Sequence, residues 1–269
     1  MLSYILPFII LILIVVFIHE YGHYYFAKKY GVGVTDFSIG FGQEIFGWND
    51  KSGTRWKICW IPLGGYVKFF GDRNVFSQAD QEKIIKKYNE EDRKKLFVLK
   101  PLYQRVLIVF GGPLANFLLA LVIFFSIYTF VGKDFTPAVI NEVQKDSPAM
   151  AGGLKDSDII LEIDGNKVKS IMDVSKYIMM STDDFIDFKV KRSYDELLLK
   201  IKPKIVMGED NLGNKINKRM VGIKLGAYNN EINHVKLGPA QAIYHAAHEV
   251  YYVSISSLKY IGAMIFGKA

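Results

Sequence analysis

The chain has 269 residues, of which 50% are hydrophobic and 23% charged, and its formal net charge is +7. A mean hydropathy of +0.14 is high for one soluble domain with ordinary charge content, and indicates very apolar segments beside polar ones. This apolar content excludes intrinsic disorder for most of the chain. The single cysteine, Cys59, excludes a disulfide scaffold.

The excess of positive charge is concentrated between residues 26 and 105, which contain 15 Lys or Arg and 9 Asp or Glu residues. A nucleic-acid-binding protein can have such a block, but no helix-turn-helix, zinc-knuckle or RNP-type motif accompanies it. We therefore expect no nucleic-acid partner. A loop on the cytosolic face of a membrane explains the basic block better.

The first apolar segment runs from Tyr4 to Ala27 and is free of charge as far as Ile18. About 20 apolar residues are needed to cross a bilayer, so this segment is long enough if its polar HEYGH sequence is tolerated. A cleaved signal peptide is the alternative. The segment lacks the basic start and the small-residue cleavage site that a signal peptide requires.

The second apolar segment, Val106–Val131, has no ionisable side chain except Tyr128. Its length suffices to cross a bilayer with some tilt. Residues 111–113, Gly-Gly-Pro, interrupt the helical pattern, and the two glycines permit close approach of another helix. Asn116 is the one strongly polar side chain, and because an unpaired amide is costly in hydrocarbon, we expect it to face another helix or a cavity.

The basic residues next to these segments predict their orientation. Lys28 and Lys29 follow the first segment, whereas Lys100 and Arg105 precede the second. Because cytosolic flanks carry the excess of Lys and Arg, residues 28–105 are expected in the cytosol.

The sequence from His19 to His23, HEYGH, places two histidines four residues apart and therefore on one side of a helix. Neutral imidazoles in this spacing can share a zinc ion, and Glu20 beside them can take a proton from water. The alternative is a polar helix face with two solvated histidines. Ionisable residues at the end of a charge-free apolar segment are costly and are candidates for function, which favours the zinc site.

Catalytic zinc sites normally have three protein ligands and an open position for water. The second apolar segment contains no Asp, Glu, His or Cys. Asp36 and Glu44 follow the motif in a strand-like sequence. His245 and His248 lie together on a C-terminal helical stretch, where we favour an ordinary amphipathic helix face over a second metal motif.

The remaining chain predicts mostly strands. Residues 37–47 and 55–70 are expected to form two strands joined by a turn at residues 49–53, with either a substrate bound along the strand edge or an ordinary hairpin on the membrane surface. Gly64 and Gly65 permit close backbone approach. Residues 80–100 are predicted to be a charged, solvated helix.

Residues 136–203 predict a small α/β domain, with a short helix after Ser147 and a longer helix over residues 173–180. Residues 210–214 are predicted to form a hairpin turn between the segments KIKPKIV and MVGIKLG. Gly238-Pro239 begins a further helix, for which we favour an interfacial amphipathic position.

Four segments together resemble the site-2 protease family of intramembrane zinc metalloproteases, and most closely its bacterial regulator-of-sigma-E type. HEYGHYYFAKKYGV resembles the zinc helix, FSIGFG with WIPLGGYVKFFGD the strand-rich loop, and RVLIVFGGPLANF the second signature span. SPAMAGGLKDSDIILEIDG resembles a PDZ domain core, with Ser157 in place of an expected glycine. The resemblance covers almost the whole chain in the family's order.

This resemblance implies that His19 and His23 are zinc ligands and Glu20 is the general base. The family takes its third ligand from an Asp in an LDG motif on a later transmembrane helix, and these 269 residues contain no LDG. We therefore expect the chain to be C-terminally truncated relative to the family. The strand-rich loop is expected to hold extended substrate, with candidate substrate-binding residues Gly64, Gly65, Tyr66 and Asn116.

The expected fold is a multi-pass α-helical membrane protein with a membrane-associated β-hairpin loop and an inserted α/β PDZ domain. Residues 1–27 would form the first transmembrane helix, 28–105 a cytosolic loop with the hairpin and a charged helix, and 106–131 the second transmembrane helix. Residues 132–228 would form a periplasmic PDZ domain with the hairpin that follows it. Residues 229–269 would form an amphipathic helix leading to C-terminal transmembrane helices that this sequence lacks.

The expected function is zinc-dependent hydrolysis of transmembrane segments in the bacterial inner (cytoplasmic) membrane, that is, regulated intramembrane proteolysis of anti-sigma-factor-type substrates. The expected cofactor is Zn²⁺. The expected partners are transmembrane protein substrates, peptide or protein tails bound by the PDZ domain, and the lipid bilayer. Two alternatives are a catalytically incomplete, membrane-bound PDZ scaffold and a soluble zinc peptidase with an N-terminal anchor. The second apolar segment argues against the anchored peptidase.

Overall fold

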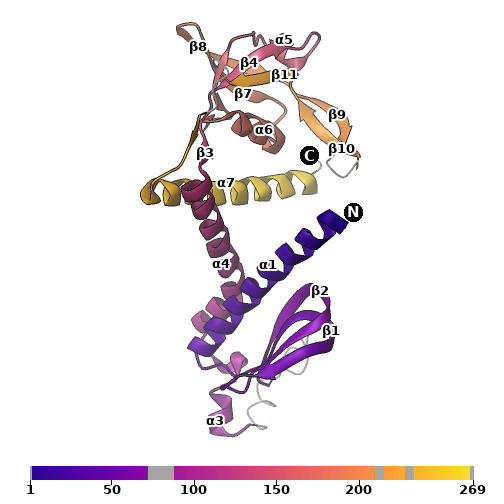
Figure 1. The fold of residues 1–269 in the computed structure, drawn as a ribbon, viewed down its shortest axis with the longest axis vertical. Coiled ribbons are helices and arrows are strands. Elements are labelled where there is room, and N and C mark those ends of the chain that lie inside the picture. Colours follow the sequence, from indigo (N-terminus) through magenta and orange to yellow (C-terminus); the bar gives the residue numbers. More distant parts are fainter. Residues whose placement is uncertain (1, 72–87, 210–214, 228–232, 267–269) are drawn as a thin grey trace. The chain divides into compact units, whose positions relative to one another are not determined.

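A computed structural model describes residues 2–71, 88–209, 215–227 and 233–266, and the chain divides into two compact units at residue 120 (Figure 1). The N-terminal unit contains helix α1, the β1–β2 hairpin and most of helix α4. The C-terminal unit contains the larger sheet and helices α5 to α7. Each unit is described separately below.

The two predicted apolar helices are confirmed as α1 (Leu2–Lys29) and α4 (Leu102–Ser126), which continues as a π-helical turn over Ile127–Val131. Both are long and apolar enough to cross a membrane, and no other helix in the described ranges meets this criterion. In their most apolar stretches only 6% and 17% of the residues are buried. Exposed apolar surfaces of this extent are typical of sites that contact a membrane or another protein.

Strands β1 (Val34–Asn49) and β2 (Arg55–Phe69) form the predicted antiparallel hairpin, and they contact α1. Phe37, fully buried, stacks on Trp56 with 4.1 Å between ring centroids and meets Tyr24 of α1 edge-on. The register shifts repeatedly between Val34 and Phe46, and Gly40 and Gly42 within this segment have positive φ angles. These aromatic contacts hold the hairpin against α1, the helix that carries HEYGH.

The far part of the hairpin exposes large apolar side chains. Trp60 is 67% exposed and Leu63 is 62% exposed, and Phe41, Ile45, Phe46 and Ile61 are also exposed. A two-stranded hairpin with such a surface is marginally stable in water, which suits contact with a membrane or a partner.

The predicted helix over residues 80–100 is wrong in its described part, and residues 80–87 lie outside the described ranges. Asn89 caps a single helical turn, α3 (Glu90–Arg93), and a 3₁₀ turn follows at Phe97–Leu99. Between them the Lys95 carbonyl accepts a hydrogen bond from Gly33 N–H, and Leu96 is buried. This tertiary packing outweighs the helical preference of the charged sequence.

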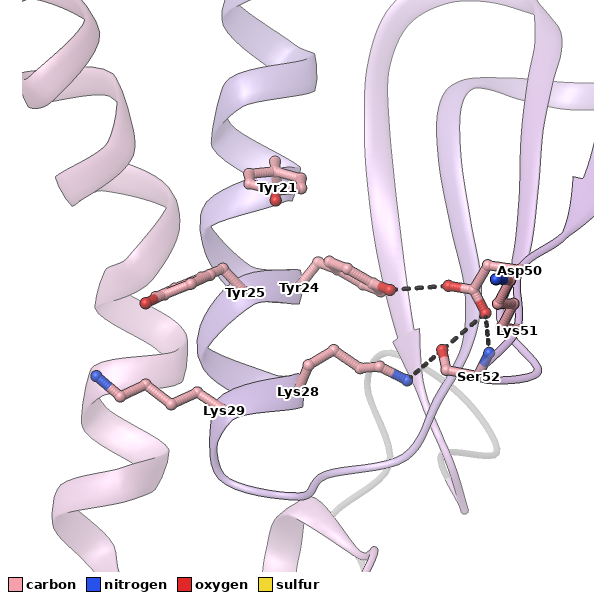
Figure 2. Close-up of a pocket in the computed structure, with 8 residues that line it drawn as sticks. All are labelled: Tyr21, Tyr24, Tyr25, Lys28, Lys29, Asp50, Lys51 and Ser52. Carbon is pink, nitrogen blue, oxygen red and sulfur yellow. Dashed lines mark hydrogen bonds between the residues drawn. The ribbon is translucent and has the colours of Figure 1, made fainter.

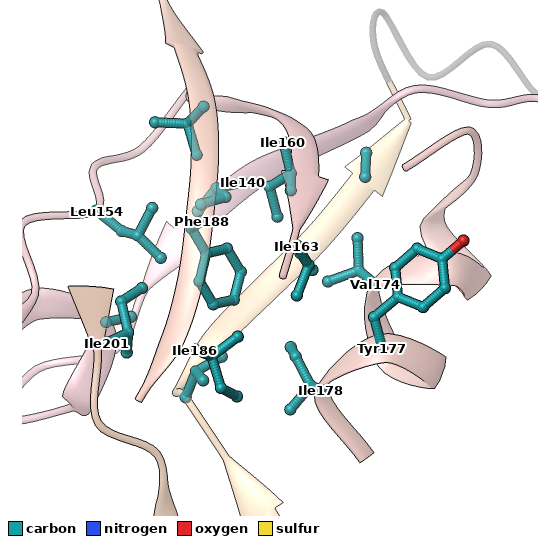
Figure 3. Close-up of a cluster of buried hydrophobic side chains, with 14 residues drawn as sticks. Ile140, Leu154, Ile160, Ile163, Val174, Tyr177, Ile178, Ile186, Phe188 and Ile201 are labelled. Carbon is teal, nitrogen blue, oxygen red and sulfur yellow. The ribbon is translucent and has the colours of Figure 1, made fainter. Parts of the chain in front are cut away.

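The main sheet of the C-terminal unit is antiparallel, with strand order β11-β4-β5-β7-β8 and the short β6 (Asn166–Lys167) beside β5. Its strands are β4 (Ala138–Val143), β5 (Ile159–Ile163), β7 (Ile186–Arg192), β8 (Asp195–Ile201) and β11 (Ile223–Ala227). The core lies between this sheet and α6 (Ile171–Met180), and Figure 3 shows Phe188 and Ile186 facing Val174 and Ile178.

The two predicted helices are present, but α6 begins at Ile171, two residues before its predicted start at residue 173. Ser147 caps α5 (Pro148–Ala151), and Ser170 with Asp173 forms a capping box at the start of α6. The strand-like segments predicted over residues 136–203 do not include β11, which joins the sheet next to β4 and lies within the expected domain of residues 132–228. A distant strand joins an antiparallel sheet through long-range pairing, which local sequence patterns do not reveal.

The predicted hairpin around residues 210–214 is confirmed only in part. Strand β9 (Lys204–Glu209) pairs with β10 (Lys215–Met220), and the turn lies outside the described ranges. The two predicted segments each cross an element boundary, at Pro203 and at Gly222, whose φ is +81°. A smaller two-stranded ladder pairs β3 (Lys133–Asp134) with β12 (His234–Val235).

Helix α7 (Pro239–Ile265) begins at the predicted Gly238-Pro239 and buries Ala242 and Ala246. On the same side Glu249 accepts a hydrogen bond from Lys176 of α6 at 2.8 Å. The outer side carries exposed apolar residues that include Tyr244, Tyr251, Leu258 and Ile265. In this helix the ion-paired Glu249 faces the protein, whereas the large apolar side chains face outward.

Candidate metal centre

Helices α1 and α4 meet backbone to backbone beside the HEYGH sequence. A Cβ atom on Gly22 would lie 2.2 Å from the Gly111 carbonyl oxygen, and one on Gly111 would lie 2.7 Å from the Gly22 carbonyl oxygen. Only glycine fits on both sides of such a contact. The predicted close approach at the Gly-Gly-Pro interruption is confirmed, and it brings the histidine face of α1 against α4.

The two histidines converge through their Nε2 atoms, which lie 3.2 Å apart. The Nδ1 atom of His23 lies 2.8 Å from the carbonyl oxygen of Ile108 on α4. Because a carbonyl only accepts hydrogen bonds, Nδ1 of His23 carries the proton, and Nε2 of a neutral His23 presents a lone pair toward His19. This is the tautomer that a metal ligand requires.

Asn116 of α4 contacts the other ring. Its Nδ2 atom lies 3.1 Å from Nδ1 of His19, and its Oδ1 atom is buried without a hydrogen-bond partner. Turning the side-chain amide over places Oδ1 at His19 Nδ1–H and removes the unpaired oxygen. The expectation that Asn116 faces another helix is thereby confirmed. In this arrangement both Nε2 lone pairs point at one space.

Gly112 borders that space. A Cβ atom on Gly112 would lie 2.4 Å from Nε2 of His23 and 2.7 Å from Nε2 of His19. The missing side chain leaves room in front of both nitrogen atoms. This role was not evident from the sequence, where Gly112 indicated only close helix packing.

The histidine pair fits a metal ion. Two nitrogen ligands of one tetrahedral zinc ion, at Zn–N distances of about 2.0–2.1 Å, lie about 3.3–3.4 Å apart. The observed 3.2 Å is close to this spacing. With the Asn116 amide turned over, both Nε2 atoms carry lone pairs, and the ring N–H groups are held by partners on α4 as in metal-binding histidines.

A third ligand is not found in the part of the chain that the structure describes, where no group of three His, Cys, Asp or Glu residues could hold a metal ion. Asp36 is paired with Lys57 at 2.7 Å, and Glu44 is paired with Arg55. His245 belongs to the C-terminal unit and packs edge-on against Tyr128 and Phe135. The helix-face interpretation of His245 therefore agrees with its contacts.

Glu20 lies on the side of α1 that faces the hairpin. A Cβ atom on Gly65 of β2 would lie 3.0 Å from Cγ of Glu20 and 2.9 Å from Cγ1 of Val16. The predicted close approach at Gly65 is therefore confirmed, and the strand passes next to the carboxylate. Glu20 thus stands between the histidine pair and β2.

Gly64 and Tyr66, the other candidate substrate-binding residues of β2, make contacts within the hairpin. Gly64 has a φ of +129°, and a Cβ atom there would meet the Phe41 ring at 2.4 Å. Tyr66 stacks on Phe41 and lies under the Lys57 ammonium group, 5.3 Å from its ring centroid. These contacts fix the shape of β2 next to Gly65.

Sequence comparison assigns the chain to a known family. A family model, Peptidase family M50, matches residues 7–269, and the chain belongs to this family. "Putative zinc metalloprotease Atu1380" of Agrobacterium fabrum is 37% identical over 99% of this chain and 70% of its own length. "Metalloprotease MmpA" of Caulobacter vibrioides is 36% identical over 78% of this chain and 55% of its own length. The chain thus spans between about half and about two thirds of these relatives.

Two solved structures are similar to part of the chain. The PDZ domain of the SdrC-like protein from Listeria monocytogenes is 28% identical over 34% of this chain and 88% of its own length, with a TM-score of 0.27. The HtrA3 PDZ domain bound to a phage-derived ligand is 25% identical, covers 28% of this chain and 89% of its own length, and has a TM-score of 0.24. TM-scores this low do not establish a common fold.

Proposed function

We propose that this protein is an intramembrane zinc endopeptidase that cleaves transmembrane segments of other membrane proteins. The observation that carries the proposal is the pair of Nε2 atoms 3.2 Å apart, with both Nδ1 atoms next to groups of α4. Membership of Peptidase family M50 supports the proteolytic activity. His19 and His23 would hold the ion.

The chain's own residues divide the work. A bound zinc ion would supply Lewis acidity, polarising a peptide carbonyl and lowering the pKa of water. Glu20 takes the proton from the attacking water and later gives a proton to the leaving amine. The Ile108 carbonyl and Asn116 hold the rings so that both Nε2 atoms stay directed at the ion. Gly112 keeps that space open.

The two exposed apolar helices support a position across a bilayer. Their most apolar stretches are 6% and 17% buried, so the protein itself does not cover them. Lys28 and Lys29 lie at the end of α1, Lys100 precedes α4, and Arg105 lies in its first turn. This distribution of basic residues supports a cytosolic position for the loop between the helices. The proposed location is the bacterial inner membrane, with the metal pair near its cytosolic side.

The hairpin next to Glu20 suits an extended substrate. A peptide bond inside a helix is shielded by its own hydrogen bonds, so a transmembrane segment must unwind before water can attack it. A strand edge replaces the lost hydrogen bonds by β-augmentation. Gly65 brings β2 into contact with Glu20, which would place a substrate added to this hairpin near the reacting groups.

The C-terminal unit would act in substrate selection. Its antiparallel sheet leaves β11 at one edge and packs α6 on one face, an arrangement that can accept a peptide or protein tail as an added strand. We retain the interpretation as a periplasmic PDZ domain over residues 132–228. The exposed apolar side of α7 supports an interfacial position for residues 239–265.

Substitution of Glu20 tests the mechanism. E20Q in the intact protein, reconstituted in vesicles with a model transmembrane substrate, should bind zinc like the wild type but cleave at least about 100-fold more slowly. E91Q, which changes an exposed glutamate of α3, should cleave at the wild-type rate. Wild-type cleavage by E20Q would refute the assignment of the base.

The other candidate function is a catalytically incomplete, membrane-bound PDZ scaffold. The specific observation in its favour is that the described residues contain no third metal ligand. Metal analysis separates the two functions. Near-stoichiometric zinc together with zinc-dependent cleavage excludes the scaffold, whereas a purified protein without metal or cleavage supports it.

A further inference from the structure

One side of α1 forms an open cleft with the β1–β2 turn. The cleft has a volume of about 670 Å³ and is lined by Tyr21, Tyr24, Tyr25, Lys28 and Lys29 of α1 and by residues 50–52 of the turn (Figure 2). We call it the Tyr–Lys cleft. Spacings of three, four, seven and eight residues from Tyr21 put the helical side chains on one face, whereas His19 and His23 lie on the other.

The cleft is positively charged because its one carboxylate is occupied by neutral donors. Asp50 Oδ1 accepts hydrogen bonds from Ser52 N–H, Ser52 O–H and Thr54 N–H. Its Oδ2 accepts hydrogen bonds from Tyr24 O–H at 2.8 Å and Trp56 N–H at 3.1 Å. None of these five donors is a lysine, so the three lysine charges of the cleft exceed the single carboxylate charge by two.

The lysines are arranged around tyrosine rings rather than around carboxylates. Lys28 Nζ lies 5.7 Å from the Tyr24 ring centroid and donates to Ser52 Oγ at 2.6 Å. Lys29 Nζ lies 6.0 Å from the Tyr25 ring centroid. Within the described residues no carboxylate forms an ion pair with these ammonium groups or with Lys51. Lys28 and Lys29 point to opposite sides of the helix (Figure 2), so the cleft presents ammonium groups and tyrosine hydroxyls along its length to a phosphate.

The position of the cleft along α1, relative to the membrane surface, favours a lipid as its ligand. An apolar helix needs about 20 residues for the hydrocarbon core, so a crossing that starts at Ile5 leaves Tyr25 to Lys29 in the headgroup layer. Tyrosine and lysine are the residues that gather at this level. We propose that the Tyr–Lys cleft binds the phosphate of an anionic phospholipid headgroup. This inference rests on the proposed membrane crossing of α1.

Such a lipid would lie on the face of α1 opposite His19 and His23. It would join α1 to the turn at residues 50–52, which already touch through the Tyr24–Asp50 and Lys28–Ser52 hydrogen bonds. Since Glu20 and Gly65 meet on the same helix and hairpin, the lipid would stabilise the spacing of the catalytic carboxylate and the substrate strand.

Lipid retention tests the proposal in the intact protein. The protein is placed in nanodiscs of equal parts phosphatidylglycerol and phosphatidylcholine with identical acyl chains, and lipids that stay bound are counted by native mass spectrometry. The wild type should retain phosphatidylglycerol in preference. K29Q/K51Q should reduce that retention about tenfold, since each lysine near an anionic surface contributes substantially to binding. The matched variant K145Q/K155Q removes two exposed lysines of the C-terminal unit and should retain lipid normally.

Three results would overturn the inference. The first is wild-type retention of phosphatidylglycerol by K29Q/K51Q. The second is displacement of the lipid by an equal concentration of inorganic phosphate, which would indicate a free-phosphate site. The third is displacement by a polyglutamate peptide, which would indicate an acidic protein partner. E20Q should retain lipid like the wild type, so the lipid readout does not depend on proteolysis.

The same nanodiscs separate this inference from the proposed function. A protein that inserts but shows no preference for phosphatidylglycerol refutes the lipid site and leaves the peptidase proposal intact. A protein that does not insert into either lipid refutes the membrane crossing, and the lipid site falls with it.

Discussion

Gly22 and Gly111 touch through their backbones, and neither position has room for a Cβ atom. Gly22 is the fourth residue of the HEYGH sequence and lies next to His23. The backbone contact between α1 and α4 therefore lies beside the two histidines. Helix packing and the arrangement of the two histidines therefore depend on the same few residues.

Replacing Gly22 by alanine should separate the two helices. The added Cβ atom would lie 2.2 Å from the Gly111 carbonyl oxygen, which is backbone and cannot move aside alone. We expect G22A to lose about 1–3 kcal/mol of unfolding free energy, as overpacked sites do, and to lose zinc. Thermal unfolding in detergent, followed by circular dichroism, measures the first effect. G262A, where no atom lies within 4 Å of the added group, should be neutral or slightly stabilising.

Replacing Gly112 by alanine should act on zinc binding more than on folding. The added Cβ atom would meet two imidazole rings, whose far ends can turn away, but it would fill the space in front of both Nε2 atoms. We expect at least about tenfold weaker zinc binding with an unchanged helical content. Isothermal titration of the metal-free protein with zinc checks this. Normal zinc affinity in G112A would show that the ion is held elsewhere.

Asn116 offers a test of which ring nitrogen carries the proton. N116A removes the partner of His19 Nδ1 and should weaken zinc binding about 10–100-fold, as loss of a ligand-orienting group does. N116D keeps an oxygen acceptor in place and should bind zinc at least as well as the wild type. If N116D were as weak as N116A, the amide would have to act as a donor to His19, and the proposed tautomer would be wrong.

The parts of this arrangement that local chemistry determines could be predicted from the sequence. The hairpin strands, the start of α7 at Gly238-Pro239 and the helical face shared by His19 and His23 follow from residue types and spacing. The cost of burying an amide in an apolar helix indicated that Asn116 needs a partner. A residue's own chemistry is sufficient for such predictions.

The features of the fold and the candidate site that could not be predicted depend on contacts between segments far apart in the sequence. The Ile108 carbonyl that binds His23 is a backbone atom, so its residue type gave no signal. Gly112 faces both histidines only because Gly22 and Gly111 set the distance between α1 and α4. Strand β11 joins the sheet by pairing with a strand about 80 residues away, and residues 94–96 leave the predicted helix because Leu96 is buried. These are long-range contacts, which one sequence does not encode locally.

The hairpin next to Glu20 should lose stability in acid through Asp50. Burial disfavours the charged carboxylate, but hydrogen bonds from Ser52, Thr54, Trp56 and Tyr24 outweigh it and lower the pKa of Asp50 below its usual range. The unfolded-state pKa of an aspartate is about 3.9. The stabilisation is therefore fully present above about pH 4 and is lost as the pH falls through the lower folded-state pKa.

The three tryptophans of the chain, Trp48, Trp56 and Trp60, all lie in this hairpin, so tryptophan fluorescence reports on it alone. We expect D50N to destabilise the hairpin at pH 7 by about 1–3 kcal/mol, and this difference from the wild type should shrink as the pH falls below 4. A difference that stayed constant down to pH 2 would show that the charge of Asp50 does not stabilise the turn.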